Sequence, residues 1–195
     1  MRNSFAKELG SPWFVPALLC LLVLVAFVVW PLASLFHQSA VDPETGRLAA
    51  MFWTHDRVAG QDVNAHIAWG SPDGRQWTYP VDAGFAGQIP NPVVLADGRL
   101  MAVYVHRHYP PSLRAVVSSD FGKTWDVANE LVYYEHGAAQ AGMAGTVELS
   151  NYYDDMGVWS FGHTHAGLLP DGTVFVAWYA GDADSLSIHW ARIEV

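Results

Sequence analysis

The hydrophobic positions of this chain follow two patterns, and the change from one to the other falls near Phe36. Between Trp13 and Phe36 no residue is charged, and the stretch Ala17–Trp30 reads ALLCLLVLVAFVVW. A helix needs roughly 20 mostly apolar residues to cross the hydrocarbon layer of a bilayer. Residues 1–40 are therefore predicted to hold one transmembrane helix, which enters the lipid bilayer through residues 13–36. After residue 40, short β-branched and aromatic runs alternate with Asp-Gly turns, which predicts a β domain over residues 41–195.

A cleaved signal peptide is the alternative interpretation of the apolar stretch, because its core of about 14 residues also fits an h-region. A cut after Ala40 would leave Gln38 at the minus-three position, where a small residue is usual. We therefore favour a retained, single-pass anchor. Arg2 and Lys7 precede the stretch and acidic residues follow it, which places the β domain on the extracytoplasmic side, periplasmic or extracellular.

Charge divides the chain at the same place. Residues 1–36 carry two basic and one acidic residue, so the remaining 8 basic and 18 acidic residues give residues 37–195 a net charge of −10. Such an acidic domain lacks the basic face with which duplex binders displace counterions, so no nucleic-acid partner is expected. The hydrophobic share of 51% excludes a disordered chain. Cys20 is the single cysteine, which excludes a disulfide scaffold.

The β-rich part repeats one unit three times. Each copy is a turn, a strand, a polar loop and a second strand, and repeats of this length predict a propeller or an array. The strand pairs are Gly46–Trp53 with Ala65–Ser71, Asp97–Val105 with Leu113–Ser119, and Asp171–Tyr179 with Leu186–Arg192.

Two of the copies continue into an Asp-rich turn. The stretch Ser118–Trp125 reads SSDFGKTW and matches the Asp-box pattern S-x-D-x-G-x-T-W, and Ser71–Trp77 is the same box shortened by one residue. The Asp carboxylate accepts backbone N–H bonds across the turn, the Gly supplies a positive φ, and the Trp packs back onto the sheet. The residues with this structural role are Ser71, Asp73, Gly74, Trp77, Ser118, Asp120, Gly122, Thr124 and Trp125.

With these boxes and the segments Gly87–Arg107 and Leu168–Asp182, the chain resembles the sialidase-like family of Asp-box (BNR-repeat) β-propellers. The resemblance covers residues 41–195 and looks like the C-terminal half of a six-bladed member. It implies a mainly β fold, a partial propeller of about three blades behind the N-terminal transmembrane helix. Three blades leave two faces of sheet uncovered. A protein partner or self-association that completes the open propeller is therefore expected.

In propeller geometry the Asp-Gly turns and Asp boxes fall on one face, and the other strand connections form a second face. This second face is the predicted binding face, and in a sialidase it binds the sugar. Its residues are His55, Asp56, Gln88, Asn91, His106, His108, His163, His165 and Asp182.

The resemblance also sets out the chemistry that a sialidase would need. Three arginines grip the substrate carboxylate, for which a planar guanidinium fork is suited, and Arg57, Arg107 and Arg114 are the candidates. A Tyr nucleophile activated by a Glu would come from Tyr152, Tyr153, Glu135 and Glu148. The early F/Y-R-I-P arginine motif is absent, and the Asp acid/base normally lies in the missing half, so the catalytic set is incomplete.

Histidine pairs raise the separate hypothesis of a metal site. His106 and His108, and likewise His163 and His165, would each lie on one side of an extended strand and could hold Zn²⁺. Such spacing is common by chance in a chain with nine His, so no metal and no cofactor are predicted.

The first functional hypothesis is a membrane-anchored, non-catalytic propeller module that binds or braces a partner, as an accessory subunit of a membrane complex. The alternatives are an exo-sialidase-type glycoside hydrolase, or a fragment of one, and a lectin-like glycan binder that uses the same face.

Overall fold

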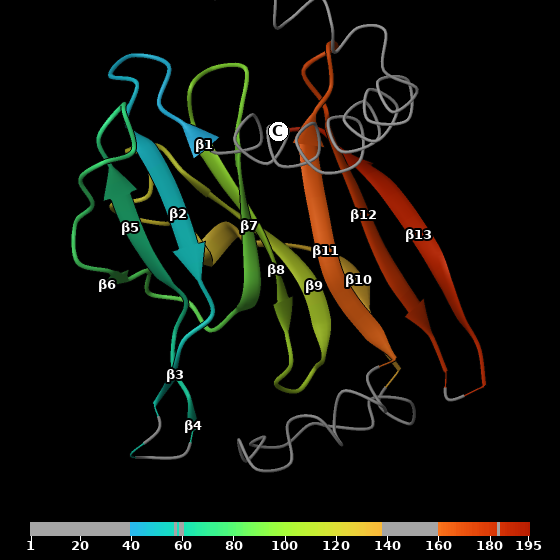
Figure 1. Ribbon diagram of the computed structural model, residues 1–195. Helices are drawn as coiled ribbons and strands as arrows, with labels where there is room; N and C mark the ends of the chain where they lie inside the picture. Colours follow the sequence, from blue (N-terminus) through green and yellow to red (C-terminus); the bar gives the residue numbers. More distant parts are fainter. Residues whose placement is uncertain (1–39, 57, 59–60, 138–159, 183) are drawn as a thin grey trace, which may run out of the picture. The chain divides into compact units, whose positions relative to one another are not determined.

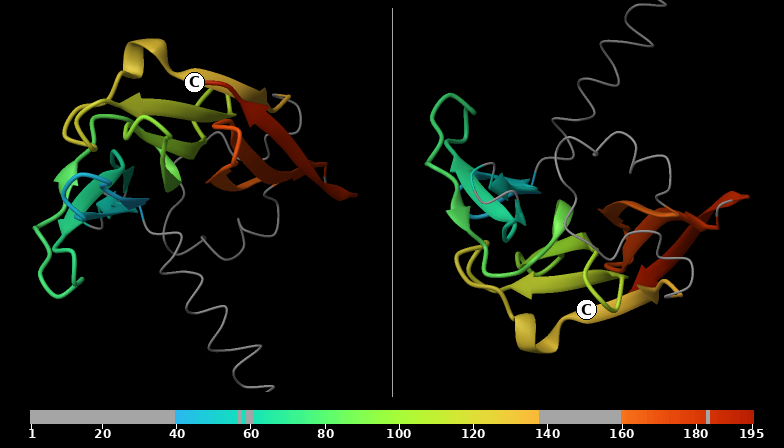
Figure 2. Two further views of the ribbon diagram at one scale, coloured as in Figure 1. Left: turned by 90° about the horizontal axis from the view of Figure 1, so that it is seen from above. Right: turned by 90° about the horizontal axis from the view of Figure 1, so that it is seen from below.

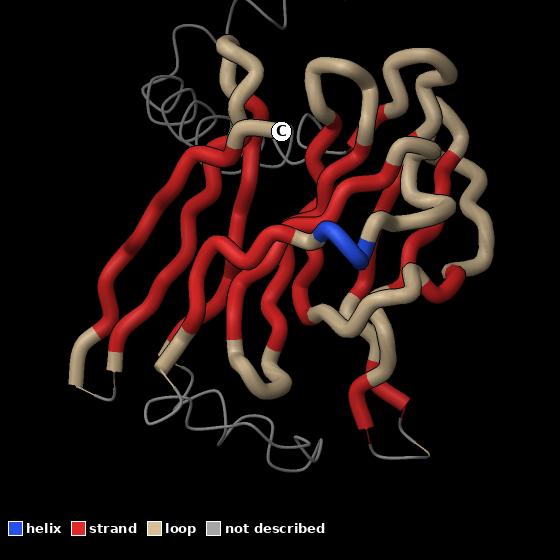
Figure 3. Tube along the Cα trace, turned by 180° about the vertical axis from the view of Figure 1, so that it is seen from behind, coloured by secondary structure: helices blue, strands red, loops and turns tan. Residues whose placement is uncertain are grey.

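A computed structural model of the chain describes residues 40–56, 58, 61–137, 160–182 and 184–195. Residues 39–195 form one compact unit by their internal contacts. The described part is mainly β with antiparallel sheets, as the sequence predicts, and its only helix is the short 3₁₀ helix η2 (Val127–Asn129) (Figures 1 and 3). No helix within these described residues is long and apolar enough to cross a membrane. The predicted anchor, residues 13–36, lies outside them.

Three antiparallel sheets carry the repeats. The first sheet has the order β1 (Ala40–Val41), β2 (Leu48–Phe52), β5 (His66–Gly70) and β6 (Val81–Asp82). The middle sheet has the order β10 (Leu131–Glu135), β9 (Ser112–Ser118), β8 (Leu100–His106) and β7 (Gln88–Val94). The third sheet consists of β11 (Phe161–Leu168), β12 (Val174–Gly181) and β13 (Leu186–Ile193), and β3 (His55–Asp56) pairs with β4 (Gln61–Asp62) in a separate ribbon.

The middle strand β8 joins two hydrophobic cores. Its side chains alternate between the two faces of the sheet, and all of Leu100–Val105 is buried. Leu100, Ala102 and Tyr104 belong to the core shared with the first sheet. Met101, Val103 and Val105 belong to the core shared with the third sheet.

The strand β7 lies at the junction of the three sheets. It contacts β2 of the first sheet and β11 of the third, and the views along the strands show the middle sheet between the other two (Figure 2). The side-chain oxygen of Asn91 on β7 accepts a hydrogen bond from the backbone N–H of Ala166 on β11 at 3.2 Å. This bond crosses from one sheet to the next, so the two strands are held by a polar contact as well as by packing.

The longer Asp-rich turn locks the middle sheet against the first. Asp120 accepts hydrogen bonds from the backbone N–H of Thr124 at 2.8 Å and from its hydroxyl at 2.7 Å. Trp125 packs against the core shared with the first sheet, and the indole of Trp69 on β5 donates to the carbonyl of Phe121 at 2.8 Å. The shorter turn is more exposed: Asp73 accepts from the backbone N–H of Arg75 at 3.1 Å.

Gly122 occupies a position that has no room for a side chain. Its φ is 86°, and a Cβ atom there would lie 2.4 Å from the side chain of Ile67 in the first sheet. We predict that Gly122→Ala lowers the free energy of unfolding by about 1–2 kcal/mol for the left-handed backbone and by about 1–3 kcal/mol more for overpacking. Denaturant unfolding followed by tryptophan fluorescence measures the loss.

Gly172→Ala is the matched control, because Gly172 has nearly the same φ of 85° but no atom lies within 4 Å of the place that its Cβ would take. It should show the backbone cost alone. Equal losses in the two variants would contradict the tight packing of the turn against Ile67.

Candidate functional site

The strand ends opposite the Asp-Gly turns bring together most of the described residues of the predicted binding face. Gln88 begins β7, His106 ends β8, and Asp182 directly follows β12. Because neighbouring strands are antiparallel, these termini lie at the same end of their sheets, at the bottom of Figure 1. We call this the polar end.

Arg107 reaches from the middle sheet to the third sheet at the polar end. Its Nε donates to the side-chain oxygen of Gln88 at 3.3 Å, and its guanidinium carbon lies 4.4 Å from the ring centre of Phe161 on β11. A Cβ on Gly162 would lie only 2.8 Å from its Nη2. The guanidinium therefore lies against the backbone of β11, and a glycine at position 162 makes this close approach feasible.

Two matching bulges flank Arg107. The register of β7 shifts between Gln88 and Asn91, and that of β11 shifts between Gly162 and His165. Each bulge contains a non-glycine residue with positive φ, Ile89 at 50° and His163 at 45°. Within this bulge His163 and His165 are exposed and Thr164 between them is buried. That the two histidines share one side of the strand stays a prediction. Bulges of this kind re-aim side chains, and such strain gathers at functional sites.

His163 and Tyr179 complete the cluster around Arg107. Their rings lie 5.7 Å apart, and a Cβ on Gly162 would be 3.3 Å from the Tyr179 hydroxyl. Partial burial lowers the pKa of His163, and electrostatic interactions with His165 and with the Arg107 guanidinium lower it further. The imidazole is thus neutral at pH 7, and the cluster offers a guanidinium, a phenol and a neutral imidazole, groups suited to an oxygen-rich ligand.

Arg114, the second candidate arginine that the structure describes, is engaged by side chains of its own sheet region. Its Nη1 forms an ion pair with Glu130, its Nε donates to the hydroxyl of Ser112 at 2.9 Å, and Glu130 also accepts a hydrogen bond from Tyr104. Burial raises the pKa of Tyr104 well above its usual range, and the bond to Glu130 raises it further. Arg57 lies outside the described residues, so the structure does not bring the three arginines together.

The carboxylates of the binding face are used in local turns. Asp56 accepts from the backbone N–H of Val58 at 2.8 Å, and Asp182 accepts from those of Asp184 and Ser185, both at 2.9 Å. Of the proposed Tyr–Glu dyads, Glu135 is an exposed residue of β10, while Tyr152, Tyr153 and Glu148 lie outside the described residues.

The remaining histidines do not assemble into a described metal site. The rings of His106 and His108 meet edge to face at 5.5 Å, and burial and the charge of Arg114 lower the pKa of His106. His55 lies in the β3–β4 ribbon. Across the described ranges, no three His, Cys, Asp or Glu residues are grouped so that they could hold a metal ion.

The sequence does not predict a hydrogen-bonded series of side chains, Ser160, His136 and Tyr134, that lies beside this cluster. The imidazole of His136 is hydrogen-bonded to the hydroxyl of Ser160 at 2.8 Å and to that of Tyr134 at 2.9 Å. It also stacks on Phe161 with ring centres 4.7 Å apart. Residues 136 and 160 are far apart in sequence and follow no motif, so only the pairing of the strands reveals their contact.

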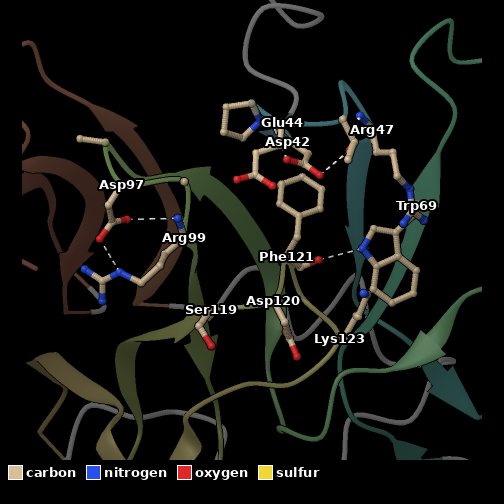
Figure 4. A pocket seen from close by; sticks show the side chains of 14 residues that line it. Asp42, Glu44, Arg47, Trp69, Asp97, Arg99, Ser119, Asp120, Phe121 and Lys123 are labelled. Atoms are coloured by element: carbon tan, nitrogen blue, oxygen red, sulfur yellow. Dashed lines mark hydrogen bonds and ion pairs between the residues drawn. The ribbon is translucent and has the colours of Figure 1, made fainter.

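Away from the polar end, a hollow of about 570 Å³ lies among the turns of the first and middle sheets (Figure 4). Arg47 lies over the ring of Trp69 with 5.9 Å between its guanidinium carbon and the ring centre. Charges of both signs line the hollow, and the carboxylates of Asp42, Asp97 and Asp120 are already engaged in hydrogen bonds within their own turns. The sequence does not predict this hollow, because its residues are local turn residues of separate repeats.

Comparison with known proteins finds similarity of fold. No family model and no curated protein matches the chain. A protein of unknown function from Dyadobacter fermentans DSM 18053 is 23% identical, with a TM-score of 0.53, over 78% of this chain and 35% of its own. This likeness concerns the fold alone.

Intramolecular trans-sialidases are among the weaker structural neighbours. The enzyme from leech is 14% identical with a TM-score of 0.39, over 80% of this chain and 30% of its own. That from Ruminococcus gnavus is 14% identical with a TM-score of 0.37, over 81% and 42%. The chain thus spans less than half of each of these three solved structures.

The pKa of His163 reports on the position of Arg107. We predict that Arg107→Gln raises this pKa toward its ordinary value of 6.5, because the substitution removes a positive charge that disfavours the imidazolium. Titration of the ring proton by NMR measures the shift. His165→Gln, which removes the other side chain that disfavours the imidazolium of His163, should shift the pKa of His163 in the same direction. An unchanged value in both variants would contradict the cluster.

Proposed function

We propose that the protein is a non-catalytic, sialidase-like partial β-propeller module that binds a partner through an uncovered face of sheet. In this proposal residues 13–36 anchor it in a membrane, with the β domain on the extracytoplasmic side, where it serves as an accessory subunit of a membrane complex. The apolar stretch and the charge pattern of the sequence support the anchor.

The observation that carries the partner-binding role is the outer face of the third sheet. Phe175, Leu186, Ile188 and Trp190 are 37, 55, 75 and 65% exposed. Phe175 and Trp190 stack on each other with ring centres 6.0 Å apart, so these two side chains form one continuous apolar surface. Contiguous exposed apolar residues mark interaction sites in soluble domains.

The arginines support a non-catalytic role. Arg114 is paired with Glu130 and 14% exposed, which leaves Arg107 as the one candidate arginine, of the two that the structure describes, that lies in the cluster at the polar end. A single guanidinium can orient a ligand, but it does not supply the three-arginine grip that the family's reaction uses.

A glycan-binding role at the polar end is the second candidate. It is favoured by the joint position of Arg107, Gln88 and Tyr179 beside two bulged strands, because guanidinium, amide and hydroxyl groups are those that bind sugar hydroxyls and carboxylates.

Partner binding predicts a larger assembly. When the full chain is extracted from its native cells in mild detergent, its protein mass should exceed the 21.4 kDa of one chain, and Trp190→Glu should reduce it by placing a charge in the buried contact. Val132→Glu, on β10, is the control, since Val132 is also exposed but lies on the middle sheet. A single copy in the wild type would contradict the proposal.

The absence of catalysis is tested on a fluorogenic sialoside. The purified full chain should release no fluorophore above the level of Arg107→Ala. Turnover that disappears in Arg107→Ala would overturn the non-catalytic assignment, whereas binding of the sialoside without turnover, lost in the same variant, would establish the glycan-binding role.

A further inference from the structure

The three sheets pack on one another by one repeated rule. The face of β8 that carries Leu100, Ala102 and Tyr104 packs on the preceding sheet. In the third sheet the residues at the equivalent positions, counted from the Asp-Gly turn, are Val174, Val176 and Trp178, and these also pack on the preceding sheet. At each of the two interfaces between sheets, the strand that follows the Asp-Gly turn therefore contributes a large aromatic residue, Tyr104 or Trp178, at the end away from that turn.

The opposite face of the middle sheet follows the same rule. Its residues Leu113 and Ala115 on β9 are 0 and 3% exposed, because the third sheet covers them. The register of the strands gives their equivalents in the third sheet. Leu113 pairs with Val105 in the middle sheet, and Ile188 pairs with Tyr179 at the same position of the third. Likewise Ala115 pairs with Val103, and Trp190 pairs with Ala177. The same positions that are buried in the middle sheet are therefore exposed in the third.

In the part of the chain that the structure describes, the first sheet has the complementary uncovered face. Its strand β2 turns Ala49 and Met51 toward the core shared with the middle sheet. The alternate residues are Leu48, Ala50 and Phe52, which stand at the positions of Leu100, Ala102 and Tyr104. Phe52 is 42% exposed, whereas Tyr104 and Trp178 are 1 and 6% exposed.

We propose that the occupant of the outer face of the third sheet is the first sheet of a second copy of this chain. Phe52 of one copy would pack beside Ile188 and Trp190 of the other. Trp178 gives the precedent, because it lies in the same core as Leu113 and Ala115, the equivalents of Ile188 and Trp190. The two free faces differ, so the contact is head to tail, and two copies related by a two-fold axis would form it twice and close a ring. This inference rests on the proposed partner-binding function and names the partner.

The mass of the purified full chain in detergent tests the inference. Analytical ultracentrifugation, with the detergent matched to the solvent density, should give two copies of the chain for the wild type. Trp190→Glu and Phe52→Glu should each give one copy, because each charge would be buried in both contacts of the ring. Val132→Glu should remain at two copies, and near-UV circular dichroism verifies that all variants are folded.

A mixing experiment distinguishes the head-to-tail contact from other pairings. A ring made of one Trp190→Glu chain and one Phe52→Glu chain has both charges in one contact and leaves the other contact intact. The mixture should therefore recover dimers that neither variant forms alone. If Phe52→Glu remains dimeric, or if mixing recovers nothing, the head-to-tail arrangement is wrong.

The outcome for the wild type separates this inference from the proposed function. A purified chain of one copy, together with a larger assembly in extracts of the native cells, would overturn the second-copy inference and show that another protein is the partner. One copy in both preparations would overturn both.

Discussion

The burial of β8 on both faces is the constraint on which the described structure depends. A strand in a two-layer protein usually turns one face to solvent, but here Leu100–Val105 contributes to two cores at once. Since side chains alternate along a strand, a slip of one residue would exchange the two sets of side chains and place Tyr104 in the wrong core. The Asp-Gly turn before the strand, with Gly98 at a φ of 87°, fixes this register.

The same constraint decides where chemistry can take place. With both faces of the middle sheet used for packing, polar side chains collect at the strand ends. There the bulges at Ile89 and His163 interrupt the regular ladders. Arg107 uses that interruption to lie on β11 beside Phe161. The site is therefore built from irregularities in otherwise regular sheets, and its rigidity is supplied by the cores beneath it.

Much of the fold is predictable because each repeat has its own local sequence pattern. The Asp-Gly turns and the alternating runs around Leu48, Leu100 and Val174 place six of the strands close to where the structure has them. The site is less predictable, because its contacts are between repeats. Nothing in the sequence near Arg114 shows that Glu130 neutralises it.

The two bulges show the same limit. Nothing in the sequence around His163 indicates that this residue has a positive φ. A bulge of this kind has no composition of its own: GQIPNP and FGHTHA share no obvious pattern, yet both strands bulge at the same point relative to the strand that they pair with.

The hydrogen bond between His136 and Ser160 has a mechanical consequence. His136 directly follows β10 of the middle sheet, Ser160 directly precedes β11 of the third sheet, and the imidazole also stacks on Phe161. Among the strands that the structure describes, the two sheets have no backbone hydrogen-bond ladder between them. A force that pulled them apart would therefore have to break this side-chain bond as well as the packing of their shared core.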